Sequence, residues 1–122
     1  MKNSYMKNLL AEKYIGEIVN VTTDRPLGTK HPKFDMVYEV NYGYVPDTKA
    51  PDGEEIDAYI LGVDKPVNKF TGVCIAVVHR LDDDDDKLIV VPEGVTFSKN
   101  KILELVNFQE QHFKSEVIVK DN

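Results

Sequence analysis

Short runs of apolar and β-branched residues recur along this chain, separated by turn residues such as proline, glycine and aspartate. Runs of this kind, bounded by turns, are typical of short β-strands. The candidate strands are residues 17–22, 58–63, 73–78, 88–91 and 117–119. Strands this short favour a small β-barrel or sandwich as the body of the fold.

Two helices are expected beside these strands. Residues 4–13 form a candidate short amphipathic helix near the N-terminus. Ser98 is expected to cap a second helix that runs to His112. The apolar residues with the spacing of one face of this second helix are Ile102, Leu105, Val106 and Phe113. The predicted fold class is therefore α+β, mainly β, with a short N-terminal helix and a C-terminal helix flanking the strands.

Size and charge exclude several classes of protein. The 122 residues suffice for one domain, expected to span residues 1–122. The 15 basic and 21 acidic side chains give a formal net charge of −6, which argues against nucleic acid as a partner. No apolar run reaches the roughly 20 residues of a membrane span. Residues 1–12 lack a signal-peptide pattern, so we expect a cytoplasmic protein with no membrane partner. Cys74 lies in an apolar run and is expected to pack as a small hydrophobe.

A first cluster of carboxylates precedes the candidate strand at 58–63. Its sequence is Asp-Gly-Glu-Glu-Ile-Asp, over residues 52–57. Residues two apart in an extended chain point the same way, so Asp52 and Glu54 share a side. Asp57 has the opposite parity and joins them only if the chain turns or bulges near Gly53. The alternative interpretation of this segment is an exposed acidic turn.

A second cluster is the aspartate run at 82–86, which Lys87 and another candidate strand follow. Alone, such a run is typical of a solvated loop. Both acidic clusters adjoin apolar strands, so a barrel could bring the two loops to one end. Carboxylate oxygens suit Mg²⁺, which commonly binds through a few carboxylates together with a phosphate-bearing substrate. The two clusters together predict a candidate metal site.

Tyrosines and cations form a third feature. Tyr38 and Tyr42 lie in a tyrosine-rich segment at 38–46, close in sequence to three cations, Arg25, Lys30 and Lys33. Such side chains could bind an anion, although lone tyrosines are commonly core residues with one wet end. Glu17 shares its alternation phase with Val19 and Val21 and is expected on their face. The alternative for Glu17 is a barrel-end residue that reaches water.

Three segments in this order resemble the soluble family I inorganic pyrophosphatases: residues 38–46, 52–57 and 85–92. The resemblance covers roughly residues 14–114, and its centre, 38–57, is the most specific part. It implies a small OB-like β-barrel with helices packed outside. It also implies Mg²⁺-dependent hydrolysis of inorganic diphosphate to two phosphates, with Mn²⁺ as a possible substitute and a homo-oligomer as a possible assembly.

The resemblance implies a role for each matching position. Glu54 would act on the nucleophilic water, Asp57 would bridge two metal ions, and Tyr42 would contact phosphate near the nucleophile. The residues implied around the metals are Asp52, Asp57, Asp82, Asp83, Asp85 and Glu17. The residues implied to bind substrate are Tyr38, Lys87, Lys114, Arg25 and Lys30, with Lys33 as a further candidate cation. Because residues 82–86 are all aspartate, their match permits a shift by one position.

Two departures from the family pattern leave other functions open. Glu54 stands where the family has aspartate, followed by Glu55 in place of a proline. Phe113 replaces the tyrosine of a Tyr-Lys pair, so a phenol is lost while Lys114 keeps the cation. One alternative is a metal-dependent phosphohydrolase for another small phosphoester. The other is a non-catalytic barrel that binds a metal, a phosphate-bearing ligand or a protein partner.

Overall fold

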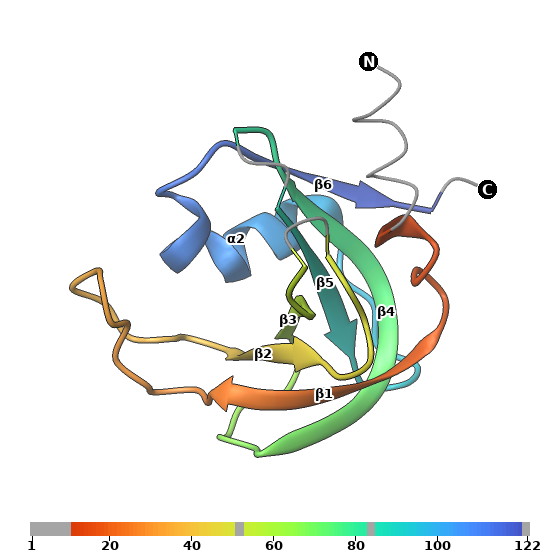
Figure 1. The fold of residues 1–122 in the computed structure, drawn as a ribbon, viewed down its shortest axis with the longest axis horizontal. Helices are drawn as coiled ribbons and strands as arrows, with labels where there is room; N and C mark the ends of the chain where they lie inside the picture. The colour runs from red at the N-terminus through yellow and green to blue at the C-terminus, as the bar shows by residue number, and fades with distance from the viewer. Residues whose placement is uncertain (1–10, 51–52, 83–84, 121–122) are drawn as a thin grey trace.

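The computed structural model describes residues 11–50, 53–82 and 85–120. Within these ranges the chain forms one six-stranded sheet and a helix (Figure 1). The strands are β1 (Ile18–Arg25), β2 (Asn41–Val45), β3 (Ile56–Ile60), β4 (Lys69–Arg80), β5 (Asp86–Val91) and β6 (Ser115–Val119). Helix α2 spans Lys99–Glu110 and lies between β5 and β6 in the chain.

The sheet closes on itself. Its strand order is β1-β2-β3-β5-β4-β6, and β1 also pairs with β4, so five strands form a barrel and β6 extends it beside β4. The β3–β5 pair is parallel and the other pairs are antiparallel. The structure confirms the prediction of a mainly β, OB-like barrel.

Strand β2 is a strand that the sequence analysis did not predict. Its residues pair with β1 on one side and with β3 on the other. At Gly43 the backbone of β1 approaches so closely that an added Cβ would lie 2.0 Å from the carbonyl oxygen of Thr22. Glycine is therefore required here, and pairing with strands on both sides holds this glycine within β2.

Strand β4 is the longest and connects the barrel to its extension. Its first half, from Lys69 to Val73, pairs with β1, while its last residues, from Ala76 to Arg80, pair with β6. Residues from Val73 to His79 also pair with β5. This arrangement carries Arg80 out of the barrel wall to the place where α2 and β6 meet.

Apolar side chains fill two clusters. One cluster includes Val21, Cys74 and Leu88, which come from β1, β4 and β5. The other joins the opposite face of the strands to α2 through Ile102 and Val106. Cys74 is fully buried, as predicted, and burial raises the pKa of its thiol to about 12.

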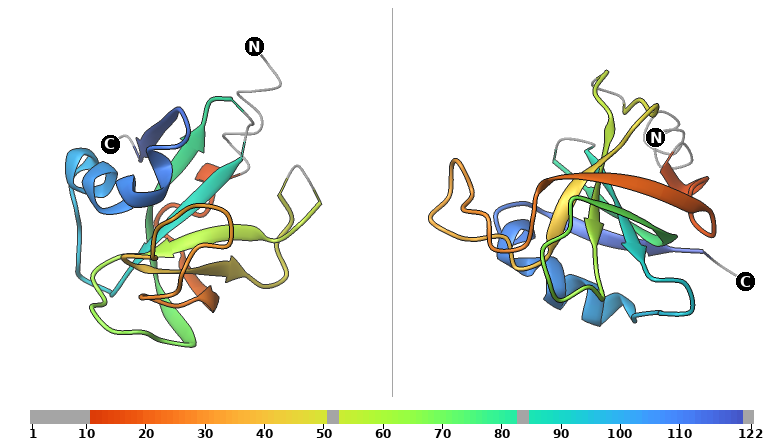
Figure 2. Two further views of the ribbon diagram at one scale, coloured as in Figure 1. Left: turned by 90° about the vertical axis from the view of Figure 1, so that its left-hand side faces the viewer. Right: turned by 90° about the horizontal axis from the view of Figure 1, so that it is seen from below.

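Helix α2 packs on the outside of the barrel (Figure 2). Its N-terminus is capped as predicted, because the Ser98 side chain accepts a hydrogen bond from the backbone nitrogen of Lys101. The helix ends at Glu110, earlier than predicted, so Phe113 lies beyond it. The predicted N-terminal helix at 4–13 falls largely outside the described residues.

Within the described ranges, no helix is long and apolar enough to cross a membrane.

Candidate active site

Strand register brings the candidate site residues together. Arg25 on β1 pairs with Tyr42 on β2, and Tyr44 pairs with Asp57 on β3. Asp57 in turn pairs with Lys87 on β5 across the parallel pair. Neighbouring strands lie about 5 Å apart, so these side chains converge although they come from four segments of the chain. The barrel therefore brings together candidate residues from motifs that are far apart in the sequence.

An acidic cavity of about 480 Å³ lies at this end of the barrel. We call it the acidic cavity, and the residues that line it are Asp24, Tyr44, Glu54, Glu55, Asp57 and Asp85. All of its charged groups are carboxylates, which come from β1, from β3 and the turn before it, and from the loop before β5. It is a concentration of oxygen ligands with a single sign of charge.

Lys87 links two of these carboxylates. Its Nζ atom donates to Asp57 Oδ2 at 2.7 Å and to Asp85 Oδ2 at 2.8 Å. The lysine side chain is only 4% exposed, whereas the two carboxylates are about one third exposed. One buried positive charge thus holds two carboxylates at the edge of the acidic cavity. The neighbouring Asp86 is buried and contacts His79 Nδ1 at 2.5 Å.

Tyr42 donates its hydroxyl hydrogen to Asp57 Oδ2, with an oxygen-to-oxygen distance of 2.9 Å. Burial and then the nearby negative charge of Asp57 raise the pKa of Tyr42 well above its usual value. The phenol therefore stays protonated and acts as a hydrogen-bond donor. Burial also raises the pKa of Asp24, and the charge of Asp57 adds to this effect.

A second cavity, of about 430 Å³, lies on the other side of Tyr42. We call it the basic cavity, and the residues that line it are Arg25, His31, Pro32, Lys33, Phe34, Tyr38, Tyr42, Arg80, Gln109 and Phe113. No carboxylate is among these lining residues, whereas three cations are. An anion would be attracted to this cavity, and a cation to the acidic one.

A buried hydrogen-bond network forms the inner wall of the basic cavity. Tyr38 donates to Gln109 Oε1 at 2.9 Å, and Gln109 Nε2 donates to the Tyr59 hydroxyl at 2.6 Å. Tyr59 donates to Glu110 Oε2 at 2.6 Å, and Glu110 accepts two further hydrogen bonds from Arg80. The network ties the segment before β2, together with β3 and β4, to the last turn of α2 and so fixes the wall of the cavity.

The structure brings most of the predicted site residues to these two cavities. Glu54, Asp57 and Asp85 line the acidic cavity, Arg25 and Tyr38 line the basic cavity, and Tyr42 and Lys87 contact Asp57 between them.

Other predicted site residues lie elsewhere. Lys30 is exposed in a bridge to Val37, and it is Lys33 that lines the basic cavity. Lys114 and Asp82 are exposed and line neither cavity, and the backbone nitrogen of Lys114 donates to Asp82 Oδ1 at 3.3 Å. Asp52 and Asp83 are outside the described residues.

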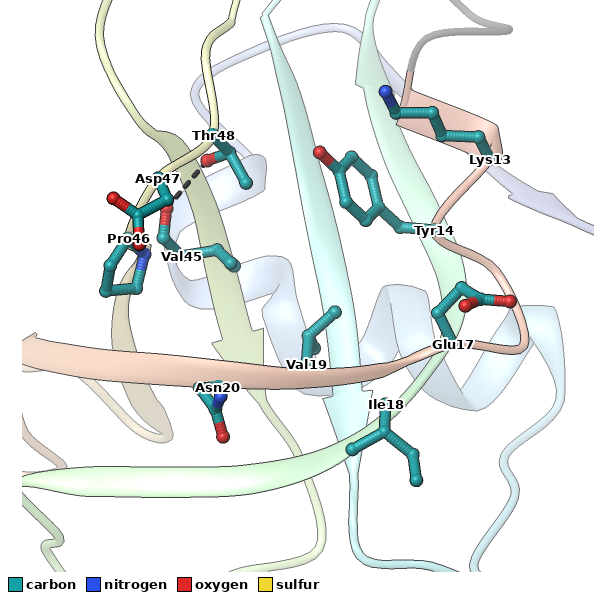
Figure 3. A pocket seen from close by; sticks show the side chains of 10 residues that line it. All are labelled: Lys13, Tyr14, Glu17, Ile18, Val19, Asn20, Val45, Pro46, Asp47 and Thr48. Atoms are coloured by element: carbon teal, nitrogen blue, oxygen red, sulfur yellow. Dashed lines mark hydrogen bonds between the residues drawn. The ribbon is translucent and has the colours of Figure 1, made fainter.

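Glu17 is also placed away from the acidic cavity. It is exposed just before β1 and lines a different cavity, of about 570 Å³, with Lys13, Tyr14 and Thr48 (Figure 3). Alternation along β1 indicated which side Glu17 shares with its neighbours but not which end of the barrel it occupies. The carboxylate that β1 contributes to the acidic cavity is instead Asp24, near the other end of the strand.

Among the charged residues of the two cavities and the network beside them, three were not singled out from the sequence: Asp24, Arg80 and Glu110. Asp24 had a signal, because it directly precedes Arg25, which was a candidate. Arg80 and Glu110 are 30 positions apart and form their ion pair only when α2 packs on β4. No local pattern identifies such a pair.

The donor set of the acidic cavity fits a hard divalent cation, because it consists of oxygen atoms and no softer ligands. Lys87 Nζ already places one positive charge between Asp57 and Asp85. Within the described part of the chain, no group of three or more His, Cys, Asp or Glu side chains is assembled closely enough to hold a metal ion. The carboxylates are therefore gathered in one cavity but are not yet in coordination geometry.

Comparison with known proteins points in the same direction as this geometry. A family model described as inorganic pyrophosphatase matches residues 14–117. An inorganic pyrophosphatase of Neisseria meningitidis is 30% identical, and the match covers 81% of this chain and 67% of that protein. One of Aeropyrum pernix is 29% identical, with 73% of this chain and 50% of that protein covered. This chain thus spans about half to two thirds of the length of these two relatives.

Solved structures share the fold. The crystal structure of an inorganic pyrophosphatase from Ehrlichia chaffeensis has a TM-score of 0.69 and 17% sequence identity, covering 86% of this chain and 87% of that one. An inorganic pyrophosphatase from Coxiella burnetii has a TM-score of 0.60 and 22% identity, covering 90% and 87%. At this level of identity the likeness supports the barrel architecture.

Proposed function

Because the chain belongs to the inorganic pyrophosphatase family, we propose that it hydrolyses inorganic diphosphate to two phosphates where its acidic and basic cavities meet. The observation that carries this proposal is the juxtaposition of the two cavities. Tyr42 lines the basic cavity and donates to Asp57 of the acidic cavity. A substrate that carries many negative charges and depends on divalent cations needs both kinds of surface side by side.

We propose Mg²⁺ as the cofactor, held by Asp57 and Asp85 with help from Asp24 and Glu54. When bound, Mg²⁺ would supply charge neutralisation and a lowered pKa for water. The resemblance also implies that Asp52 is one of the residues around the metal ions, and this role is part of the same proposal. Glu17 is not included, because it lies at a different cavity.

The chain's own residues would then position the reactants. Glu54, which lines the acidic cavity, would orient the attacking water and accept its proton. As the oxygen of that water bonds to one phosphorus, the bond from this phosphorus to the bridging oxygen breaks and the second phosphate leaves. Arg25 and Lys33 would bind the phosphate groups in the basic cavity and neutralise part of their negative charge.

Tyr42 and Lys87 would keep the geometry of the acidic cavity. Tyr42 remains a donor at neutral pH because its pKa is raised by burial and by Asp57. Lys87 restrains Asp57 and Asp85 through the two hydrogen bonds of its Nζ atom. Small misplacements at such a site cost on the order of a hundredfold in rate, so these restraints are part of the proposed function.

The test is release of inorganic phosphate from diphosphate by the purified protein. Reactions with Mg²⁺, with Mn²⁺ and with a chelator should show rapid release that requires a divalent cation. A panel with a nucleoside triphosphate and an aryl phosphate monoester under the same conditions should show much slower release. A protein that prefers one of these organic phosphates, or that releases no phosphate with either metal, would overturn the proposal.

A further inference from the structure

Arg80 occupies an unusual position for a charged side chain. It is the last residue of β4, only 6% exposed, and lines the basic cavity beside Tyr42 and Phe113. Its guanidinium therefore meets the interior of the molecule on one side and the cavity on the other. Arg80 is not among the site residues predicted from the sequence.

Two groups fix the plane of this guanidinium. Glu110 accepts from Arg80 Nε at 3.1 Å and from Arg80 Nη2 at 2.8 Å, which is a two-point contact. The guanidinium also lies over the Phe113 ring, with Arg80 Cζ 3.7 Å from the ring centroid. The side chain is thus held in one orientation before any ligand arrives.

The third nitrogen of the guanidinium has a different environment. Arg80 Nη1 lies 3.6 Å from Asp85 Oδ2, which is within ion-pair distance but longer than a hydrogen bond. Asp85 belongs to the acidic cavity and already accepts from Lys87. Arg80 Nη1 therefore lies at the boundary between the two cavities, where a phosphate group would approach the carboxylates.

A purely structural purpose explains this arrangement poorly. Burying two charges costs desolvation, and an ion pair of this kind is often no more stabilising than apolar side chains of the same volume. Arg80 uses Nε and Nη2 on Glu110, so the donor that it can offer to a phosphate oxygen is Nη1. Phe113 has no hydroxyl group that could donate to a phosphate. Its ring instead contacts the guanidinium of Arg80, whose N–H groups can donate.

We propose that Arg80 is a substrate-binding residue of this chain, which donates from Nη1 to a phosphate group of diphosphate. Glu110 acts as its positioning residue. This inference rests on the proposed function for the identity of the anion, but the preformed guanidinium and the cavity are properties of the structure itself. The proposed phosphate-binding surface thus includes Arg80, which Glu110 of α2 holds in place through two hydrogen bonds.

The experiment compares Arg80→Gln, Arg80→Lys and Arg80→Gln/Glu110→Gln with wild type. Lys69→Gln is the matched control, because Lys69 is an exposed cation at the opposite end of the same strand and lines neither cavity. KM and kcat for diphosphate with Mg²⁺ are measured together with the melting temperature of each variant. Binding of methylenediphosphonate, a diphosphate analogue that is not hydrolysed, is measured by calorimetry.

Loss of one charge-assisted hydrogen bond predicts that Arg80→Gln weakens analogue binding and raises KM by about 10- to 100-fold. Arg80→Lys should restore part of this loss, because it keeps the charge without the planar guanidinium. The double variant removes both buried charges, so it should regain stability relative to Arg80→Gln while its analogue affinity stays low. Lys69→Gln should bind the analogue as wild type does.

Separate outcomes distinguish the two ideas. If wild type hydrolyses diphosphate and the Arg80 variants keep its KM and analogue affinity, the Arg80 inference fails and the proposed function stands. If analogue affinity follows melting temperature across all variants, Arg80 is structural and the inference fails. A wild type without turnover whose analogue binding still depends on Arg80 overturns the proposed hydrolysis alone. A wild type that neither turns over nor binds the analogue overturns both.

Discussion

Replacing Glu110 with alanine should strongly destabilise the protein. The Glu110 carboxylate accepts from Arg80 Nε at 3.1 Å, from Arg80 Nη2 at 2.8 Å, from Tyr59 at 2.6 Å and from Ser115 at 2.6 Å. Removing one partner of a buried ion pair leaves the other charge uncompensated, at a cost of about 3–5 kcal/mol. Unfolding entropy of about 2.1 cal/mol/K per residue makes 1 kcal/mol worth about 4 °C in a chain of this length. The melting temperature should therefore fall by about 12–20 °C.

Thermal unfolding followed by circular dichroism measures this change. The matched control is the double variant Arg80→Met/Glu110→Leu, which removes both charges and keeps apolar volume. It should melt well above Glu110→Ala, because no charge is left buried without a partner. A Glu110→Ala variant that melts within about 2 °C of wild type would refute the reasoning, since it would mean that burying Arg80 without its partner costs almost nothing.

Acid titration provides a second test of the same pair. Burial alone would raise the pKa of Glu110, but the hydrogen bonds from Arg80, Ser115 and Tyr59 outweigh it and hold the pKa below its usual value of 4.5. A carboxyl whose pKa is lower in the folded state stabilises the fold above its unfolded pKa, and this contribution is lost as pH falls through the folded pKa. Wild type should therefore lose stability on acidification below about pH 4.5, and Glu110→Ala should lack this component.

Three further predictions follow from single positions. Gly43→Ala should destabilise the barrel by about 3 kcal/mol or more in denaturant titration, because its Cβ would meet the backbone of Thr22 at 2.0 Å; a variant as stable as wild type would contradict the close β1–β2 approach. Tyr42→Phe should lower kcat/KM for diphosphate by about 10- to 100-fold, since Asp57 loses a hydrogen bond; unchanged kinetics would show that this bond is dispensable. Cys74 should react with an alkylating reagent only after unfolding, because it is buried and its pKa is raised to about 12; rapid alkylation of the native protein would count against its burial.

The strands that could be predicted from sequence are those that contain a run of apolar and β-branched residues. Runs such as 73–78 and 88–91 are fully apolar and rich in β-branched residues, and they lie in β4 and β5 of the barrel. Strand β2 could not be predicted this way, because Gly43 and the polar Asn41 give it no β-branched run. It is a strand because β1 and β3 both pair with it, which is a property of the assembled barrel.

The candidate site shows the same division. Asp57 and Glu54 were identified because they stand in a compact local motif, and the structure places both at the acidic cavity. Alternation along one strand was used to place Glu17, but it is Asp24 that reaches the acidic cavity, near the other end of β1, where the pairing with β2 shifts register between Thr23 and Arg25. Arg80 gave no local signal at all, since helix packing creates its environment.

The most direct test of the account compares Asp57→Asn with wild type in Mg²⁺-dependent release of phosphate from diphosphate. Asparagine keeps the shape of the side chain and can still accept from Tyr42, so the variant should fold as wild type does. Turnover should fall by at least about a hundredfold. Losing a residue that only supports a metal ligand costs up to about a hundredfold, and Asp57 is proposed to be a ligand itself. A folded Asp57→Asn protein that releases phosphate at the wild-type rate would contradict the placement of the active site at the acidic cavity.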